Sequence, residues 1–142
     1  MMYDGMNDLG LATALAPAAA GVANTPYVTT ILDCQGKDEV TLALVTGVEA
    51  DADSTFTVLL EESAASNMAG QNAVADEDLI GTEALASFTF ADDGEPRKLG
   101  YRGSKRYIRA TITPANNAGT DHFLAGLCVF KDGYGKEPNP PV

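Results

Sequence analysis

The feature that most constrains the fold of this chain is a repeated alternation of apolar and polar side chains with a period of two. The clearest run covers residues 39–46, in which Val40, Leu42 and Leu44 are the apolar positions. A second run of the same kind covers residues 54–62. Successive side chains of a β-strand point to opposite faces, so these runs predict strands with one buried and one exposed face.

Clusters of Gly, Pro, Asn and Asp separate the alternating runs, at intervals typical of antiparallel sandwiches. Strands are expected over residues 27–33, 39–46, 54–62, 83–91, 97–102, 105–113 and 121–131. A turn at Gly103-Ser104 is expected to join two of them, 97–102 and 105–113, into a hairpin. Residues 63–78 predict a loop, with a short helical turn near 74–79. The pattern therefore predicts an all-β fold, an antiparallel β-sandwich or jelly-roll-like barrel of about seven or eight strands.

The length of 142 residues fits one domain. Residues 1–26, rich in Ala and Gly, predict an N-terminal arm that either stays flexible or orders on a neighbouring molecule. Within this arm, Leu9–Leu15 is expected to form one or two helical turns, which Pro17 would end. Residues 27–131 are assigned to the β-sandwich domain, and residues 132–142 to a Gly- and Pro-rich C-terminal tail.

The charges are unevenly distributed along the chain. The net charge is −11, yet six of the nine Lys and Arg residues lie between Arg97 and Arg109, whereas residues 49–95 hold twelve acidic residues and no basic one. Binding of nucleic acid requires Lys and Arg to displace counterions from phosphates, so the net charge argues against a nucleic-acid partner. No stretch approaches the ~20 apolar residues of a membrane span. Residues 1–8 lack the basic residues of a secretory signal, so synthesis in the cytoplasm is expected.

Motifs of catalysis are not found in the sequence. It contains no phosphate-binding or dinucleotide-binding glycine motif and no Gly-x-Ser-x-Gly elbow. The single histidine, His122, lies beside no recognisable nucleophile and is expected on the surface or on an edge strand. We therefore predict that the chain is not an enzyme and carries no cofactor.

Metal ligands and disulfides are also weakly indicated. Cys34 and Cys128 are expected to be small buried side chains, with a disulfide between them as the alternative. One His and two separated Cys do not form a standard zinc site. The stretch Glu49–Asp53 places alternate carboxylates close together but lacks the glycine and distal glutamate of a calcium-binding loop. A solvated acidic loop is expected there, with calcium binding as the alternative.

The basic region is the strongest candidate for binding a partner. Residues 105–113 alternate, so that Ile108, Ala110 and Ile112 suit a core and Tyr107 and Arg109 suit an outer face. That outer face is either a solvated surface with cross-strand ion pairs or a docking face, since clustered Arg beside Tyr is typical of interfaces. The predicted partner-binding residues are Arg97, Lys98, Arg102, Lys105, Arg106, Tyr107 and Arg109, with Leu9, Leu11, Leu15 and Pro17 from the arm.

Three short motifs resemble a known family. They are Gly100-Tyr-Arg-Gly-Ser-Lys-Arg-Tyr-Ile-Arg109, the early segment Leu15-Ala-Pro-Ala-Ala19 and the strand end Leu60-Glu-Glu-Ser63. Their spacing agrees over residues 9–131, and together they are similar to tailed-phage capsid decoration proteins, also called cement proteins. Such relatives end in a short basic segment, whereas residues 131–142 here are rich in Gly and Pro.

The resemblance implies a compact β-sandwich in the virion, on the capsid exterior, with the major capsid protein as its partner. It also implies self-association on the capsid, with a trimer favoured, and no nucleic-acid or membrane partner. The alternatives are a head–tail joining or tail structural protein, and a carbohydrate-binding β-sandwich module on the virion. Carbohydrate-binding modules present Trp or Tyr platforms, and this chain has no Trp.

Overall fold

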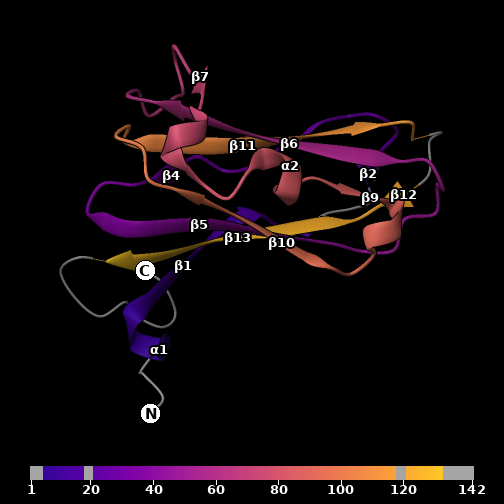
Figure 1. Ribbon diagram of the computed structural model, residues 1–142, viewed down its shortest axis with the longest axis horizontal. Helices are drawn as coiled ribbons and strands as arrows, with labels where there is room; N and C mark the ends of the chain where they lie inside the picture. The colour runs from indigo at the N-terminus through magenta and orange to yellow at the C-terminus, as the bar shows by residue number, and fades with distance from the viewer. Residues whose placement is uncertain (1–4, 18–20, 118–120, 133–142) are drawn as a thin grey trace.

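The computed structural model, which describes residues 5–17, 21–117 and 121–132, is a sandwich of two antiparallel β-sheets stacked face to face (Figure 1). The first sheet has five strands in the order β1 (Leu9–Leu15), β13 (Leu124–Asp132), β5 (Lys37–Thr46), β10 (Pro96–Tyr101) and β8 (Leu79–Ile80). The all-β prediction is confirmed.

The second sheet has six strands. Its main path is β3 (Tyr27–Val28), β11 (Tyr107–Ala115), β6 (Thr55–Ser63) and β7 (Asn72–Ala73), while β4 (Leu32–Asp33) pairs with β11 and β9 (Phe88–Thr89) pairs with β6. A small separate sheet joins β2 (Gly21–Val22) to β12 (Asp121–His122). The short helices are α1 (Gly5–Asp8), η1 (Asp76–Asp78), α2 (Glu83–Ala86) and η2 (Phe90–Asp92). None of the described helices is long and apolar enough to cross a membrane.

The core lies between the two sheets and is built by the alternation seen in the sequence. In β5, Val40, Leu42 and Leu44 are buried and the residues between them are more exposed. The largest fully buried side chains include Phe56 from the second sheet and Leu99 from the first. Because one apolar face of each sheet must be removed from water, stacking the two faces is the stable arrangement. The short helical turn predicted near residues 74–79 is confirmed by η1.

The predicted hairpin over residues 97–113 is wrong. Strand β10 pairs with β5 and β8 in the first sheet, whereas β11 pairs with β3, β4 and β6 in the second. The connection over residues 102–106 therefore crosses from one sheet to the other. A backbone hydrogen bond fixes the first residue of this connection, since Arg102 N donates to Asp78 O at 2.9 Å. A Gly-Ser pair between two strands suits a hairpin, but it does not say which strands pair.

The predicted strand over residues 83–91 is wrong except at Phe88–Thr89, which form β9. Its first part is helix α2, which begins because the Thr82 side chain caps it and accepts from Leu85 N. The helix is tied to β6, since Leu60 N donates to the Glu83 carboxylate at 2.7 Å. This arrangement leaves Leu85 exposed and buries Phe88, which stacks on Phe56 with ring centroids 4.7 Å apart.

The helical turns predicted for Leu9–Leu15 are wrong, because this segment is the edge strand β1. The close approach of β1 to β13 requires glycine at position 10, where a Cβ atom would lie 2.1 Å from the Phe130 ring. Part of the predicted arm therefore belongs to the sandwich, and the boundary at residue 26 stays a prediction. The predicted tail, apart from its first residue, lies outside the described residues.

Candidate binding surfaces

The structure places eight of the eleven predicted partner-binding residues at three sites on the sandwich. Arg109 and Tyr107 lie on the outer face of the six-stranded sheet. Arg102, Lys105 and Arg106 lie on the link between β10 and β11, at one end of the sandwich. Lys98, Leu9 and Leu11 lie on the outer face of the five-stranded sheet. The remaining three are Arg97, which pairs with Asp92 and Glu95, Leu15, which packs partly buried against the core, and Pro17, which is exposed.

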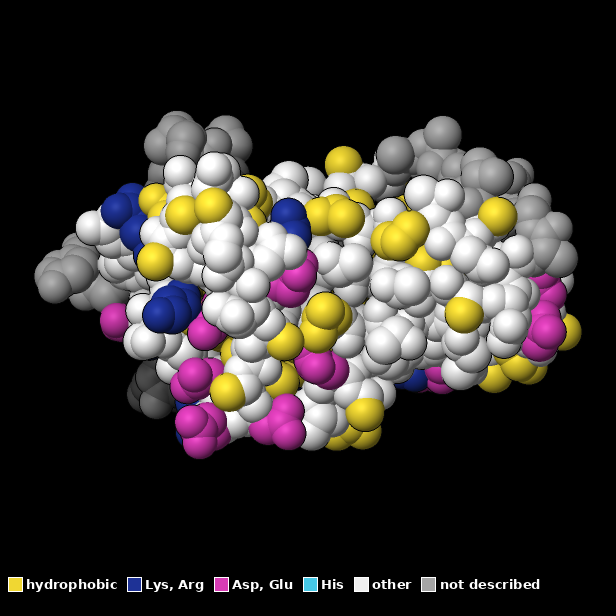
Figure 2. Space-filling model, turned by 90° about the horizontal axis from the view of Figure 1, so that it is seen from above, with side chains coloured by type: hydrophobic (Ala, Val, Ile, Leu, Met, Phe, Trp, Pro, Cys, Tyr) yellow, Lys and Arg dark blue, Asp and Glu magenta, His cyan; other side chains and the backbone are white. Residues whose placement is uncertain are grey.

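On the outer face of the six-stranded sheet, the charges are paired within the chain. Arg109 lies directly opposite Glu61 on β6, with Nη2 3.0 Å from Oε2. Thr111 donates to the same oxygen at 3.0 Å. Cross-strand ion pairs were one of the two alternatives for this strand, and the structure shows such a pair at Arg109. In Figure 2, which views the sandwich from this side, hydrophobic side chains are scattered among polar ones and several Lys and Arg gather toward one end.

The end of the sandwich that carries the link between β10 and β11 contains an open cleft of about 410 Å³. Its walls come from the turn between β4 and β5 and from residues 101–106. The lining residues are Cys34, Gln35, Lys37, Asp38, Val40, Tyr101, Arg102, Gly103, Ser104, Lys105 and Arg106. We call this feature the basic cleft. Four of the nine Lys and Arg residues of the chain line it, against one carboxylate, Asp38.

The shape of the basic cleft depends on the phenol of Tyr101. Its hydroxyl donates to Glu62 Oε2 at 2.7 Å and accepts from Lys105 N at 2.9 Å, so it fixes the link from inside. Burial and the hydrogen bond to Glu62 raise the pKa of Tyr101 well above its usual value. At position 103, a Cβ atom would lie 2.6 Å from the Tyr101 ring, so the link passes this close to the ring only with glycine there.

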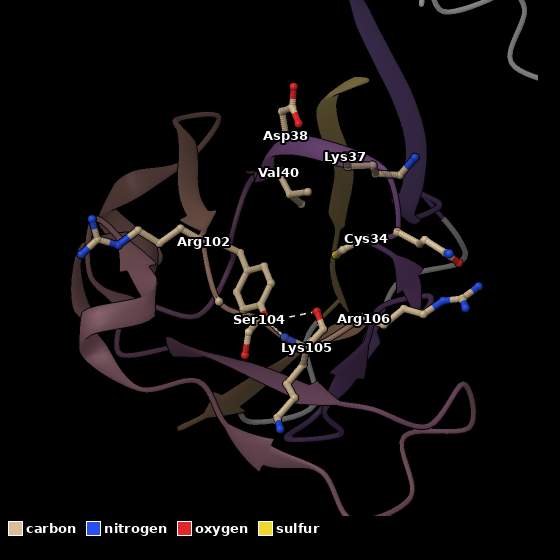
Figure 3. Close-up of a pocket in the computed structure, with 11 residues that line it drawn as sticks. Cys34, Lys37, Asp38, Val40, Arg102, Ser104, Lys105 and Arg106 are labelled. Carbon is tan, nitrogen blue, oxygen red and sulfur yellow. Dashed lines mark hydrogen bonds between the residues drawn. The ribbon is translucent and has the colours of Figure 1, made fainter. Parts of the chain in front are cut away.

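The cations of the basic cleft differ in how far they are neutralised. Arg106 binds Asp33 through two contacts, Nε–Oδ1 at 2.9 Å and Nη2–Oδ2 at 2.7 Å, which lowers the pKa of Asp33. Lys37 places its ammonium 3.6 Å from the centroid of the Phe130 ring. In the described part of the chain, no carboxylate lies within ion-pair distance of Lys105 or Arg102. Figure 3 shows the charged ends of these residues directed outward around the cleft, while Val40 points inward.

The outer face of the five-stranded sheet is apolar across four neighbouring strands. One row across the sheet holds Leu11, Val129, Thr41, Gly100 and Ile80, and the next holds Thr13, Leu127, Ala43 and Lys98. The third row contains Ala125, Val45 and Pro96. Leu11, Leu127, Val45 and Ile80 are all exposed. We call this feature the apolar face.

A groove borders the apolar face on each of two sides. The groove beside β8 and α2 measures about 500 Å³ and includes Ile80, Leu85 and Lys98 in its lining. The other, of about 110 Å³, lies beside Phe123 and includes the predicted residue Pro17. Together the grooves widen the apolar face. Singly exposed apolar residues are normal on a protein surface, whereas a contiguous apolar surface of this kind marks a site of interaction.

Two buried polar residues were not predicted from the sequence. His122 is fully buried rather than on the surface, although it does lie on the short edge strand β12. Its Nδ1 is hydrogen-bonded to the Tyr27 hydroxyl, and its Nε2 lies 3.0 Å from Ala23 O. Glu49, expected in a solvated loop, is buried, and its two carboxylate oxygens have no hydrogen-bond partner among the described residues. Both are placed by contacts to distant residues, which no local pattern reveals.

Burial raises the pKa of Glu49 to about 7, with further contributions from Asp93 and Asp51. No group of three or more His, Cys, Asp or Glu in the described segments is arranged to hold a metal ion. Cys34 and Cys128 are free thiols, so the disulfide alternative is wrong. Burial raises the pKa of Cys128 to about 11 and that of Cys34 to about 12, which keeps both protonated at neutral pH.

Comparison with known proteins supports the fold and goes no further. No protein-family model and no curated protein matches the sequence. Among solved structures, the PBSX exported protein XepA aligns with a TM-score of 0.56 and 16% identity, over 87% of this chain and 37% of XepA. This chain therefore spans little more than a third of the length of XepA.

Two further structures align more weakly. That of the infectious bursal disease virus Gx strain has a TM-score of 0.47 and 10% identity, over 88% of this chain and 32% of that chain. That of a Clostridium thermocellum xylanase complexed with xylohexaose has a TM-score of 0.43 and 11% identity, over 87% and 28%. Neither likeness is close enough to carry an argument. The similarity to XepA, at its low identity, shows that this chain shares a β-sandwich fold with that protein.

Proposed function

We propose that this chain is a structural virion protein that binds the outer surface of an assembled phage capsid and stabilises it. The motif resemblance to capsid decoration proteins suggests the role, and the β-sandwich fold is compatible with it. One observation of the structure supports it most directly, namely the apolar face of the five-stranded sheet. Head–tail joining, a tail position and carbohydrate binding are the rival roles.

The apolar face approaches the size of a protein interface. Strands β1, β13, β5 and β10 have seven, nine, ten and six residues. At about 3.3 Å per residue and about 4.8 Å between strands, they present roughly 500 Å². A standard protein–protein interface buries about 800 Å² on each partner. Leu127 and Val45 would lie near its centre and Leu11 at its β1 edge, with Lys98 within the rows and Lys131 and Glu39 at one border as the charged residues. Such a composition favours another protein as the ligand.

Stabilisation of a capsid follows from binding alone. A protein that binds only the assembled shell lowers the free energy of that state relative to dissociated subunits, by mass action. Many copies on one shell act together, so each contact can be weak. The predicted partner is therefore the assembled lattice of the major capsid protein, and binding should distinguish shells from free subunits.

The test is co-sedimentation with undecorated shells of the major capsid protein encoded with this chain, compared with free subunits. The variant L11Q/L127Q places polar groups on two neighbouring strands of the apolar face and should lower shell occupancy by about tenfold or more. The matched control, V28Q/L59Q, changes two side chains on the outer face of the opposite sheet. Their exposures of 50% and 37% resemble those of Leu11 and Leu127, at 46% and 44%.

Failure to bind shells would overturn the proposed function, and equal effects of the two double variants would overturn the role of the apolar face. Failure of the unaltered protein to bind intact shells would favour a joining or tail component. Equal loss of occupancy in both double variants, with unchanged circular dichroism, would show that the apolar face is not the contact. Binding of glycans on an array, in the absence of shell binding, would favour the carbohydrate-binding alternative.

A further inference from the structure

The two ends of the sandwich differ in their Lys and Arg residues, although Asp and Glu occur at both ends. The basic cleft lies where β5 begins, at Lys37, and the loop after Thr46 lies at the other end of the same strand. Ten residues of extended chain span about 30 Å. The far end is formed by residues 47–53 and by η2 with the turn that follows it, residues 90–95. This end, which we call the acidic end, carries six carboxylates, on Glu49, Asp51, Asp53, Asp92, Asp93 and Glu95. Glu49 is buried, Asp51 is half-buried, and Asp92 and Glu95 pair with Arg97, so Asp53 and Asp93 are the exposed carboxylates left for a partner.

The two loops of the acidic end are held together as one surface. Glu49 N donates to Asp93 Oδ1 at 2.9 Å, and Thr46 Oγ1 donates to Asp92 O at 3.3 Å. Val48, in the first loop, has a side chain that is 75% exposed. The acidic end is therefore one connected surface with an exposed apolar side chain beside its carboxylates.

Like charges are crowded at the acidic end. The neighbouring carboxylates of Asp93 and Asp51 add to the effect of burial on the pKa of Glu49. The hydrogen bond to Asp51, together with burial and charge repulsion, raises the pKa of Asp53. Within the described ranges, no Lys or Arg lies at ion-pair distance from Asp53 or Asp93. A cationic surface docked here would relieve this repulsion.

The basic cleft is the complementary surface on the same chain. Its ammonium and guanidinium groups at Lys105 and Arg102 make no ion pair with described residues, and Lys37 lines the opposite side of the cleft (Figure 3). Acidic groups do occur nearby, at Asp38 in the lining and at Asp76–Asp78 beside Arg102. The cleft nevertheless holds the largest group of cations in a chain with net charge −11. Val40 and the Tyr101 ring supply apolar surface inside it.

We propose that the acidic end of one copy of this chain docks into the basic cleft of a second copy, in a head-to-tail arrangement. Val48 enters the cleft and the carboxylates of Asp53 and Asp93 face Arg102 and Lys105. The two contact surfaces are different, so the contact is heterologous and repeats around a closed ring or along an open chain. This inference does not rest on capsid binding, because it uses neither the apolar face nor a capsid.

The experiment uses two neutralising variants of the full chain at low ionic strength, without capsids. R102Q/K105Q removes the cations of the cleft and keeps the acidic end. D53N/D93N removes carboxylates from the acidic end and keeps the cleft, and the amide oxygen introduced at position 93 can still accept from Glu49 N. Sedimentation velocity and native mass spectrometry report the assembly of the 14.8 kDa chain. Each variant alone should self-associate at least about tenfold more weakly than the unaltered protein.

The decisive sample is the equimolar mixture of the two variants. The intact acidic end of the first fits the intact cleft of the second, so the mixture should form heterodimers and nothing larger. A contact between identical surfaces would not produce this pattern. K98Q/K131Q is the matched control, because it removes two cations from the outer face of the five-stranded sheet and should leave self-association unchanged.

Three results would overturn the proposal. One is an unaltered protein that stays monomeric at millimolar concentration in low salt. Another is undiminished self-association of either neutralised variant. The third is a mixture of the two variants that contains no heterodimer. Each result is independent of shell co-sedimentation, so failure here leaves the proposed function to be judged by its own test.

Discussion

The hydroxyl of Tyr27, on β3, is hydrogen-bonded to Nδ1 of His122, which lies on β12, 95 residues further along the chain. With Nε2 donating to Ala23 O, Nδ1 of the neutral ring accepts from the phenol. The two rings meet edge to face, with centroids 5.2 Å apart. This contact ties the small β2–β12 sheet to the six-stranded sheet and satisfies both nitrogens of a fully buried imidazole.

The variant Y27F tests this contact. It removes the phenol oxygen and leaves Nδ1 of His122 without that partner in a buried site, which should lower the free energy of unfolding by about 1–3 kcal/mol. Urea denaturation at pH 7.5 measures the change. Y107F, which alters a half-buried tyrosine on the outer face of β11, is the control and should change stability little. Equal stability of Y27F and the unaltered protein would show that the hydrogen bond contributes nothing.

The ion pairs of Arg109 and Arg106 should contribute unequally to stability. The side chains of Arg109 and Glu61 are 21% and 12% exposed, against 46% and 43% for Arg106 and Asp33. R109A should therefore lower the free energy of unfolding by about 1–2 kcal/mol, and R106A by less, because water screens the exposed pair. Urea denaturation of the two variants in parallel gives the comparison, and a larger loss for R106A would contradict it.

This difference affects how the basic region is tested. Reversing the charge at Arg109 would place a new carboxylate beside Glu61 and destabilise the sheet. A test of partner binding by charge reversal at both Arg106 and Arg109 therefore needs a folding control at Arg109. Reversal at Lys105, which is exposed and pairs with no described carboxylate, probes the surface more cleanly.

The buried carboxyl of Glu49 should make stability depend on pH. Its pKa is raised to about 7 in the folded chain, from an ordinary value of 4.5. The folded state thus binds the proton more tightly than the unfolded state. The free energy of unfolding should fall as pH rises from about 4.5 through 7, by up to about 3 kcal/mol from this group.

The variant E49Q removes this titration. It should gain stability relative to the unaltered protein at pH 8 and gain little at pH 5, as measured by urea denaturation at both values. E95Q, a change of the same kind at an exposed position of the same end, is the control and should show no such pH-dependent difference. A gain for E49Q that is equal at pH 5 and pH 8 would contradict the assignment.

Glycine at position 10 should be required for β1 to pair with β13. The Cβ atom of an alanine would lie 2.1 Å from the Phe130 ring and would displace it. G10V should therefore expose the backbone amides at the β1–β13 contact to hydrogen exchange while β6 and β11 stay protected. T13V, at a partly exposed position of the same strand, is the control. Unchanged protection of β13 in G10V would show that the ring moves aside at little cost.

The sequence by itself determined the long strands β5, β6 and β11 and the side of each that is buried. In β5, β6 and β11 the period-two pattern is local, because each side chain alternates with its immediate neighbours. The predicted core positions of β11, Ile108, Ala110 and Ile112, are buried accordingly. The sequence also indicated where cations gather. Leu9 and Leu11 stay predicted contact residues, and the structure places them, exposed, on the strand β1 rather than on the expected helix.

Only the tertiary structure decided which strands are partners and which surfaces result. Backbone hydrogen bonds join residues far apart in the sequence, so Arg109 lies opposite Glu61 and β10 pairs with β5 rather than with β11. That pairing divides one basic segment among two sheet faces and a cleft, and it creates the apolar face from four strands. It also buries Glu49 and His122, whose surroundings come from distant loops. The alternation of side chains is set by neighbouring residues, whereas pairing depends on the free energy of the whole packed chain, which no local pattern contains.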